Sequence, residues 1–368
     1  MKPEQMNVLL VSDMGKVGGT EIATLIAARE LQPHVHFVGV FGKMGPISQK
    51  ISDLGVENFD AVVHTKNPLK VMQYLNQLVS VINKYEINVI HAQMARPVPL
   101  LWAAKKLSKQ KDLKIFWTSR GLDHETYPRV CPMFDKMGVI GVGNCKQEQQ
   151  KLIRNGYNPA HTSYVYNAYR LDPKTAVKVK PKRDVINIGT LSALREGRRV
   201  DLFLEIAKYI VDKTDYASKV NFLIGGDGPH RETLEQMVRD FDLVDKITFC
   251  GNINDVEVFM QGIDIFVSPA VVEGDSGAGL SNAIVEAMIT KTPVCAYDAA
   301  AICEIVINDF SGHLVKPKDT IAMVNAIINT IENPKASAKY VENAFDLILK
   351  ECDPKSYANK LLKIYEEM

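Results

Sequence analysis

Three glycine-rich segments of this 368-residue chain have the composition of loops that hold phosphate groups. They are residues 13–21 (DMGKVGGTE), 225–231 (GGDGPHR) and 269–288 (PAVVEGDSGAGLSNAIVEAM), and each follows an apolar run. Glycines at a strand-to-helix turn let backbone N–H groups approach a phosphate, and the helix N-terminus adds a favourable potential. The first segment has neither the GxxxxGK(S/T) nor the GxGxxG spacing. Taken alone, it is better explained as a tight turn that needs glycine torsions, and the second is open to the same interpretation.

The third segment adds a carboxylate, Glu286, inside the apolar stretch AIVEAM. A helix is predicted to begin near Ser281, so its first N–H groups could hold a diphosphate. Glu286 lies one turn further and could accept hydrogen bonds from ribose hydroxyls. The alternative is a solvated glutamate on the helix surface, but its apolar neighbours favour the binding role.

A basic cluster follows the apolar run at 185–189, within the segment GTLSALREGRR. It contains Arg195, Arg198 and Arg199. A guanidinium can pair with diphosphate oxygens through two hydrogen bonds and can neutralise a leaving group. A solvated basic loop is the competing interpretation.

The elements that must position these loops form two series of short apolar runs separated by amphipathic stretches. The runs are residues 7–12, 36–41, 89–91, 114–118, 139–143 and 163–166, then 185–189, 220–224, 246–250, 263–268 and 293–297. Stretches with helical periodicity lie between them, as at 21–31, 71–84, 202–211 and 231–241. The pattern predicts an α/β protein with two doubly wound parallel sheets, separated at 171–184 by a lysine- and proline-containing linker. Ligand loops follow strand carboxyl ends, so we expect those of both domains to face a shared crevice.

Charge divides the chain in the same place. The total is 44 basic and 43 acidic residues, which argues against a nucleic-acid binder with a strong positive field. Residues 1–170, however, have 21 basic and 13 acidic side chains, and residues 171–368 have 23 and 30. A basic N-terminal half would suit an anionic acceptor or membrane surface, and ordinary variation in surface charge explains it equally well.

The sequence predicts a cytoplasmic protein. No segment approaches the about 20 uninterrupted apolar residues of a membrane span, and the short apolar run near the start ends at Asp13, so no signal peptide is expected. The six cysteines are scattered without a CxxC pair, which predicts reduced thiols and no metal site.

Together these segments resemble the retaining glycosyltransferases of family 4, which have the GT-B architecture. The strings GGDGPHRETLE, GLSNAIVEAM and EIVINDFSGHLVKPKD carry the resemblance in the C-terminal half. In the N-terminal half GGTE and residues 89–91, 118–127 and 165–167 fit the pattern more loosely. The resemblance covers nearly the whole chain.

This resemblance implies a GT-B fold of two Rossmann-like domains. The predicted organisation is an acceptor-binding domain at 1–170, a linker at 171–183, a nucleotide-sugar-binding domain at 184–345 and a helical segment at 346–368 that packs back toward the first domain. It also implies transfer of a sugar from a UDP-, GDP- or ADP-sugar to a glycan or lipid-linked acceptor, with retention at the anomeric carbon and without a cofactor or metal. We expect a role in cell-surface polysaccharide or lipopolysaccharide synthesis.

The resemblance also assigns residues to the site. The predicted catalytic residues are Arg195 and Arg198, which would stabilise the departing diphosphate, and Arg120. The predicted donor-binding residues are Gly18, Gly19, Gly226, Arg231, Gly279, Leu280, Ser281 and Glu286. The predicted acceptor- or sugar-binding residues are Lys16, His91, Glu273 and Asp275.

Two positions depart from the family pattern. Eight residues before Glu286, where the family has a second glutamate that contacts the donor sugar, this chain has Ala278. Sugar recognition then differs, or Glu273 or Asp275 substitutes, or activity is lost. Arg120 stands where many members have a histidine near the anomeric centre; an arginine cannot act as a base but could bind the acceptor or a phosphate.

Three further alternatives remain open from the sequence. Residues 100–102 (LLW), followed by five lysines up to position 114, could contact an anionic membrane at the inner face of the plasma membrane, or could form a helix with a solvated lysine face. His91 could face a ligand, but a packed histidine is the more common case. The chain could also be a degenerate GT-B protein that binds nucleotide or glycan without turnover, or a nucleotide-sugar 2-epimerase.

Overall fold

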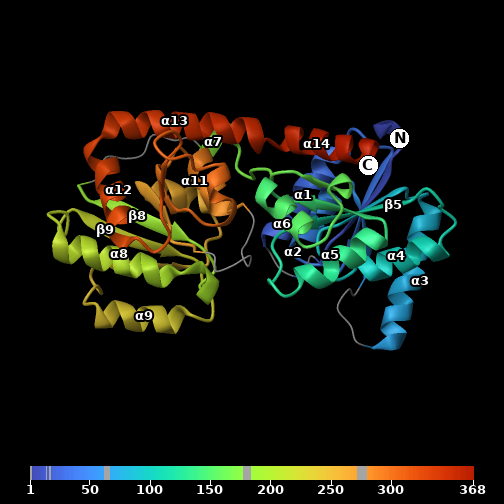
Figure 1. The fold of residues 1–368 in the computed structure, drawn as a ribbon, viewed down its shortest axis with the longest axis horizontal. Coiled ribbons are helices and arrows are strands. Elements are labelled where there is room, and N and C mark those ends of the chain that lie inside the picture. The colour runs from blue at the N-terminus through green and yellow to red at the C-terminus, as the bar shows by residue number, and fades with distance from the viewer. Residues whose placement is uncertain (1, 14, 16–17, 62–66, 177–183, 272–279) are drawn as a thin grey trace. The chain divides into compact units, whose positions relative to one another are not determined.

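The computed structural model describes residues 2–13, 15, 18–61, 67–176, 184–271 and 280–368. The chain forms two compact α/β units (Figure 1). Unit 1 consists of Met1–Arg170 together with Cys352–Met368, and unit 2 consists of Leu171–Glu351. The sequence-based boundary at 345 falls inside a helix of unit 2, α13 (Pro334–Glu351).

Unit 1 contains a seven-stranded parallel sheet in the order β3-β2-β1-β4-β5-β6-β7. Its strands are β1 (Asn7–Val11), β2 (Phe37–Gly42), β3 (Glu57–Asp60), β4 (Val89–Ala92), β5 (Lys114–Ser119), β6 (Val139–Gly143) and β7 (Thr162–Tyr164). All five residues of β1 and of β6 are buried, which is why these strands read as continuous apolar runs.

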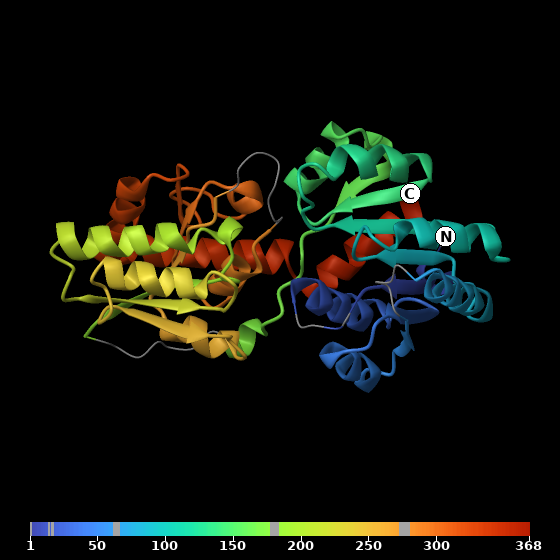
Figure 2. The ribbon, with the colours of Figure 1, turned by 90° about the horizontal axis from the view of Figure 1, so that it is seen from below.

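Helices cover both faces of this sheet (Figure 2). Val8 and Leu10 of β1 pack with α1 (Gly19–Leu31), α2 (Pro46–Asp53) and α14 (Pro354–Glu367). Leu9 and Val11 face the other way, toward α3 (Pro68–Lys84), α4 (Val98–Leu107), α5 (Tyr127–Lys136) and α6 (Lys146–Arg154). This alternation follows from the two-residue period of a strand.

The last helix of the chain belongs to unit 1. Figures 1 and 2 both show α14, in red, beside the blue and cyan elements of that unit. Its residue Tyr365 is fully buried, with its ring centroid 4.8 Å from that of Phe116 on β5. The core of unit 1 is therefore completed by residues from the far end of the sequence.

Unit 2 contains a six-stranded parallel sheet in the order β10-β9-β8-β11-β12-β13. The strands are β8 (Ile186–Leu191), β9 (Val220–Gly225), β10 (Ile247–Gly251), β11 (Ile265–Ser268), β12 (Val294–Tyr297) and β13 (His313–Val315). The other helices are α7 (Pro173–Ala176), α8 (Val200–Lys213), α9 (Arg231–Asp240), α10 (Val256–Gly262), α11 (Asn282–Ile289) and α12 (Thr320–Glu332). The predicted pair of doubly wound sheets is confirmed.

In the described residues, no helix is both long enough and apolar enough to cross a membrane. The lysine-rich stretch after residue 102 forms the end of α4 and the turn that follows it, where Lys106 lies over the Trp102 ring at 5.4 Å from its centroid. This local cation–π contact does not test the predicted membrane association.

Candidate functional site

In the arginine cluster of unit 2, Arg199 forms an ion pair with a carboxylate, whereas Arg195 and Arg198 form none among the described residues. Arg199 is the N-cap residue of α8, with a positive φ of 50°, and pairs with Asp201, with Nη2 2.7 Å from Oδ2. Arg195 is exposed and Arg198 is partly exposed, and neither pairs with a carboxylate in the described part of the chain. Burial, together with the positive charge of Arg195, lowers the pKa of Arg198. An anion bound at Arg195 and Arg198 would relieve this repulsion.

The glycines of the 225–228 turn allow it to pack directly against the chain that carries Arg195. Gly226 has φ +115°, and a Cβ atom there would lie 1.9 Å from the carbonyl oxygen of Ser192. The backbone N–H of Leu194 donates to the carbonyl of Asp227 at 3.0 Å. The predicted turn therefore exists, and its glycine is needed for close approach of two backbone segments.

Arg231, predicted to bind the donor, is engaged within its own helix. Its Nε lies 2.8 Å from Oε1 of Glu235, and its Nη1 lies 3.4 Å from Oδ2 of Asp227. The guanidinium also lies over the Phe249 ring, 5.8 Å from the centroid. These contacts fix the start of α9, and the predicted contact of Arg231 with a donor stays a prediction.

Glu286 is buried, with 4% of its surface exposed, between apolar neighbours on α11. The alternative of a solvated surface glutamate is therefore wrong. Ser281 is the N-cap residue of α11, yet its side chain makes no capping hydrogen bond, and Leu280 beside it is 5% exposed. The remaining predicted residues Lys16, Glu273, Asp275 and Gly279, and the departure at Ala278, lie outside the described residues.

The glycines before α1 are arranged around Glu21. Gly18 is the N-cap residue of α1 and Gly19 is its first residue. The N–H of Gly18 donates to the Glu21 carboxyl, whose pKa is nevertheless raised, because burial outweighs this hydrogen bond. A Cβ atom on Gly18 would lie 2.7 Å from Oε2 of Glu21. The N-terminus of α1 is therefore occupied by the carboxylate of Glu21 from its own first turn.

Arg120 directly follows β5, at the carboxyl edge of the unit 1 sheet. Its Nη2 donates to Oε1 of Gln93 at 2.7 Å, and its Nη1 donates to Oδ1 of Asn167. Tyr357 of α14 also hydrogen-bonds to the guanidinium, and burial lowers the pKa of Arg120. Gln93 and Tyr357 are not among the residues predicted for the site; the sequence signal for Gln93 is that it is the first polar residue after a buried strand.

His91, predicted to bind the acceptor, is fully buried and uses both ring nitrogens internally. Nδ1 lies 2.6 Å from the Tyr365 hydroxyl, and Nε2 lies 2.7 Å from Oγ1 of Thr118. Burial and the nearby charge of Arg120 lower its pKa to about 3, so the ring is neutral. His91 thus joins α14 to the sheet, and its predicted binding role stays a prediction.

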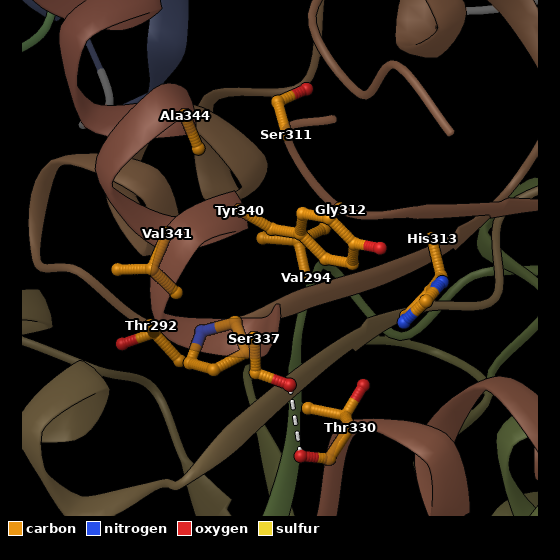
Figure 3. A pocket seen from close by; sticks show the side chains of 11 residues that line it. Thr292, Val294, Ser311, Gly312, His313, Thr330, Ser337, Tyr340, Val341 and Ala344 are labelled. Carbon is orange, nitrogen blue, oxygen red and sulfur yellow. Dashed lines mark hydrogen bonds between the residues drawn. The ribbon is translucent and has the colours of Figure 1, made fainter. Parts of the chain in front are cut away.

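A cavity elsewhere in unit 2 is too small for a sugar. It lies between β12, β13, α12 and α13, with Ser337 donating to the Thr330 carbonyl at 2.9 Å on one side (Figure 3). Its volume of about 10 Å³ accommodates about one water molecule. This cavity is therefore not a candidate sugar site.

Comparison with known proteins finds a family match within the C-terminal half of the chain. Residues 182–333 match the family model described as "Glycosyl transferases group 1". The poly(ribitol-phosphate) alpha-N-acetylglucosaminyltransferase of Staphylococcus aureus is 25% identical over 179 residues, 48% of this chain and 35% of the relative. The lipopolysaccharide core biosynthesis mannosyltransferase LpcC of Rhizobium leguminosarum is 26% identical over 159 residues, 43% of this chain and 44% of the relative. The chain thus spans less than half the length of these curated relatives.

The similarity in structure extends over both units. The solved structure of Anabaena HepE, crystallised with UDP and glucose, superposes with a TM-score of 0.82 and covers 99% of this chain and 100% of HepE. The sequence identity is 17%, so this likeness concerns the fold. The two parallel sheets and this likeness identify the architecture as GT-B.

Proposed function

We propose, from the GT-B fold and the match of unit 2 to the group 1 glycosyl transferases, that this protein is a retaining glycosyltransferase. It moves a sugar from a nucleoside diphosphate sugar to a glycan or lipid-linked acceptor in the synthesis of a cell-surface polymer. The observation that carries the proposal is the pair Arg195 and Arg198, two neighbouring guanidiniums without an acidic partner among the described residues. The names of the two curated relatives support a polymer or lipopolysaccharide acceptor, and HepE with UDP and glucose supports the donor class.

On the donor side, each role follows from charge and position. Arg195 and Arg198 pair with the diphosphate oxygens and neutralise the charge that develops when the bond to the sugar breaks. Glu286, buried in the first turns of α11, accepts hydrogen bonds from the ribose hydroxyls. Because the guanidiniums supply positive charge to the leaving group, transfer needs no metal, and EDTA is expected to leave the rate unchanged.

On the acceptor side, we assign no side chain as the base that takes the proton of the acceptor hydroxyl. Arg120 cannot act as a base, and His91 has both ring nitrogens engaged. In the proposed mechanism the departing diphosphate oxygen takes the proton of the acceptor hydroxyl. That hydroxyl attacks the anomeric carbon from the same face, so the anomeric configuration is retained. The epimerase alternative receives no support from the relatives, whereas a binder without turnover stays an outcome of the test.

A thermal-shift panel of UDP-, GDP-, ADP- and dTDP-sugars tests the donor site. At one hundred times its dissociation constant, the correct donor stabilises the wild type by about 2.7 kcal/mol and raises Tm by about 5 °C. We expect Glu286→Gln and Arg198→Gln to lose this rise, while the exposed controls Glu232→Gln and Arg239→Gln retain it.

The panel can also contradict the proposal. If no nucleotide sugar at millimolar concentration shifts Tm of the wild type, the donor site is wrong. If one binds but no nucleoside diphosphate is released with any acceptor extract, the protein is a binder without turnover.

A further inference from the structure

Arg120 is a shielded cation whose direct partners are all neutral. Its hydrogen bonds go to the side-chain oxygens of Gln93 and Asn167 and to Tyr357. Glu21 acts on it through space, but no carboxylate lies within ion-pair distance of Arg120 in the part of the chain that the structure describes. A guanidinium that is partly removed from water without a paired counter-ion is costly, so a negative charge from outside would be stabilising here.

Buried polar atoms without hydrogen-bond partners lie at the carboxyl edge of the unit 1 sheet, where Arg120 also lies. The buried atoms without a hydrogen-bond partner include Ser12 Oγ, Gln93 Nε2, Arg120 Nε and Asn144 Oδ1. Each belongs to the first residue after a strand, namely β1, β4, β5 and β6, which are neighbours in the sheet. Gln93 is only 2% exposed. Because buried polar atoms are nearly always paired, these orphans along one edge indicate a ligand or water that would complete them. Ser12 Oγ, Gln93 Nε2 and Arg120 Nε can donate to an anion, whereas Asn144 Oδ1 is an acceptor that needs a donor such as water.

The sign of the charge limits what the ligand can be. Arg120 is charged and partly exposed, so an incoming group can reach it, and His91 behind it is neutral. Residues 1–170 have 21 basic and 13 acidic side chains, which favours an anionic partner for unit 1 over a cationic one. Guanidinium groups match the geometry of oxyanions, phosphate above all.

We propose that Arg120 binds a phosphate ester of the acceptor, so that the substrate class is a phosphorylated glycan or lipid-linked sugar. That the phosphate belongs to an acceptor rests on the proposed function. The anion site itself does not depend on sugar transfer. Binding forms charge-assisted hydrogen bonds to the guanidinium, and no covalent step occurs at this site.

The test measures binding of inorganic phosphate, methyl phosphate and hexyl phosphate to the full-length chain by calorimetry. The background is Arg195→Gln/Arg198→Gln, which removes the competing anion site of unit 2. We expect the two esters to bind at least as tightly as inorganic phosphate. Arg120→Gln should weaken their binding at least tenfold, and Arg120→Lys should weaken it less.

A second variant protects the test against misfolding. Gln93→Glu places a carboxylate of the same shape 2.7 Å from Nη2 of Arg120 and supplies the missing counter-ion. We expect this variant to keep or raise Tm and to lose phosphate-ester binding at least tenfold. Unchanged ester binding in folded Gln93→Glu overturns the proposal, and so does a site that takes inorganic phosphate but neither ester.

The outcome is separable from that of the donor site. A nucleotide-sugar shift without ester binding at Arg120 leaves the proposed transfer intact and removes this site. Ester binding that depends on Arg120, without any nucleotide-sugar shift, retains the anion site and removes the proposed transfer.

Discussion

At the scale of single residues, burial decides which chemistry a side chain keeps. Histidine is the usual proton carrier near neutral pH, yet His91 is held neutral between the Tyr365 and Thr118 hydroxyls. Arginine cannot give up its proton in a protein, and Arg120 therefore brings a permanent charge to the same region. A neutral histidine behind a charged arginine suits binding of an anion better than proton transfer.

The pKa of His91 predicts an acid-labile unit 1. Its pKa is about 3 in the folded chain and about 6.5 when unfolded, so below pH 6.5 the unfolded chain takes up the proton first. The free energy of unfolding should fall by about 1.4 kcal/mol per pH unit from pH 6 to 4. Urea titrations followed by tryptophan fluorescence measure unit 1, because both tryptophans, Trp102 and Trp117, belong to it.

The matching variants separate His91 from other groups. His91→Gln should have a smaller pH slope, although it is less stable at pH 7, and the exposed control His34→Gln should have the wild-type slope. An equal slope in His91→Gln and the wild type would show that other groups cause the acid lability.

A buried carboxylate braces the segment that carries Arg120. Oε1 of Glu148 accepts hydrogen bonds from Ser119 Oγ and the Tyr127 hydroxyl, both at 2.5 Å, and Leu122 N–H donates to that hydroxyl at 2.9 Å. Ser119 and Leu122 flank Arg120. Glu148, itself 1% exposed, thus holds both sides of it.

This brace predicts a stability cost and a binding cost together. Tyr127→Phe leaves Leu122 N–H without its acceptor and should lower the free energy of unfolding of unit 1 by about 2 kcal/mol. It should also weaken phosphate-ester binding severalfold. Tyr157→Phe is the matched control, because its hydroxyl donates to the Val139 carbonyl instead, so it should lose stability but keep ester affinity. Equal ester affinity in the two variants would refute the brace.

At the scale of elements, the turn at 225–228 requires glycine at position 226. A side chain at Gly226 would collide with the Ser192 carbonyl, and its φ of +115° is unfavourable for other residues. Gly226→Ala should therefore lower the free energy of unfolding of unit 2 by about 3 kcal/mol and displace the segment before Arg195. Nucleotide-sugar affinity should fall at least tenfold.

Gly197→Ala is the control for this prediction, because Gly197 lies between Arg195 and Arg198 and a Cβ atom there meets nothing within 4 Å. We expect a melting temperature close to that of the wild type by circular dichroism. If Gly226→Ala is as stable as Gly197→Ala, the backbone contact is not as close as described.

The sequence predicts the buried elements better than the edges. Fully apolar runs became β1, β6 and their neighbours, because a parallel strand buried on both faces has no polar alternation. The strands β3 (ENFD) and β13 were not predicted, and both are short strands at sheet edges, with 4 and 3 residues. So short a segment has too few residues to show a strand pattern, and β3 is in addition only partly buried.

For the site, residue type and spacing locate loops but not partners. The glycine turn and the buried position of Glu286 follow from local pattern. The engagement of Arg231 depends on Glu235 one turn away, and that of His91 depends on Tyr365, 274 residues away in the chain. A contact at that separation exists only after the chain has folded.

At the scale of the whole molecule, the two units divide the chemistry. The arginine pair and Glu286 belong to unit 2, whereas Arg120 and its orphaned neighbours belong to unit 1. The chain passes from unit 1 to unit 2 after Arg170 and returns after Glu351. Unit 1 is therefore incomplete until its last helix has been synthesised.

This dependence predicts the effect of ending the chain at Glu351. The truncation removes the buried side chains of α14 from the core of unit 1, namely Tyr357, Ala358, Leu361, Leu362, Ile364 and Tyr365. Losing one large core side chain costs about 2–5 kcal/mol, so losing this set exceeds the about 5–15 kcal/mol that stabilises a domain. It also takes the Tyr365 partner from His91 and the Tyr357 partner from Arg120.

We expect the truncated chain to show red-shifted emission from Trp117, which is fully buried in the intact protein, and to lose phosphate-ester binding. Unit 2 contains its own sheet and core, so the nucleotide-sugar shift should persist in the truncated chain. Adding a peptide of residues 352–368 should restore part of the buried tryptophan signal. Native tryptophan emission and native ester binding in the truncated chain would contradict this prediction. The core of unit 1 would then be stable without the apolar face of α14.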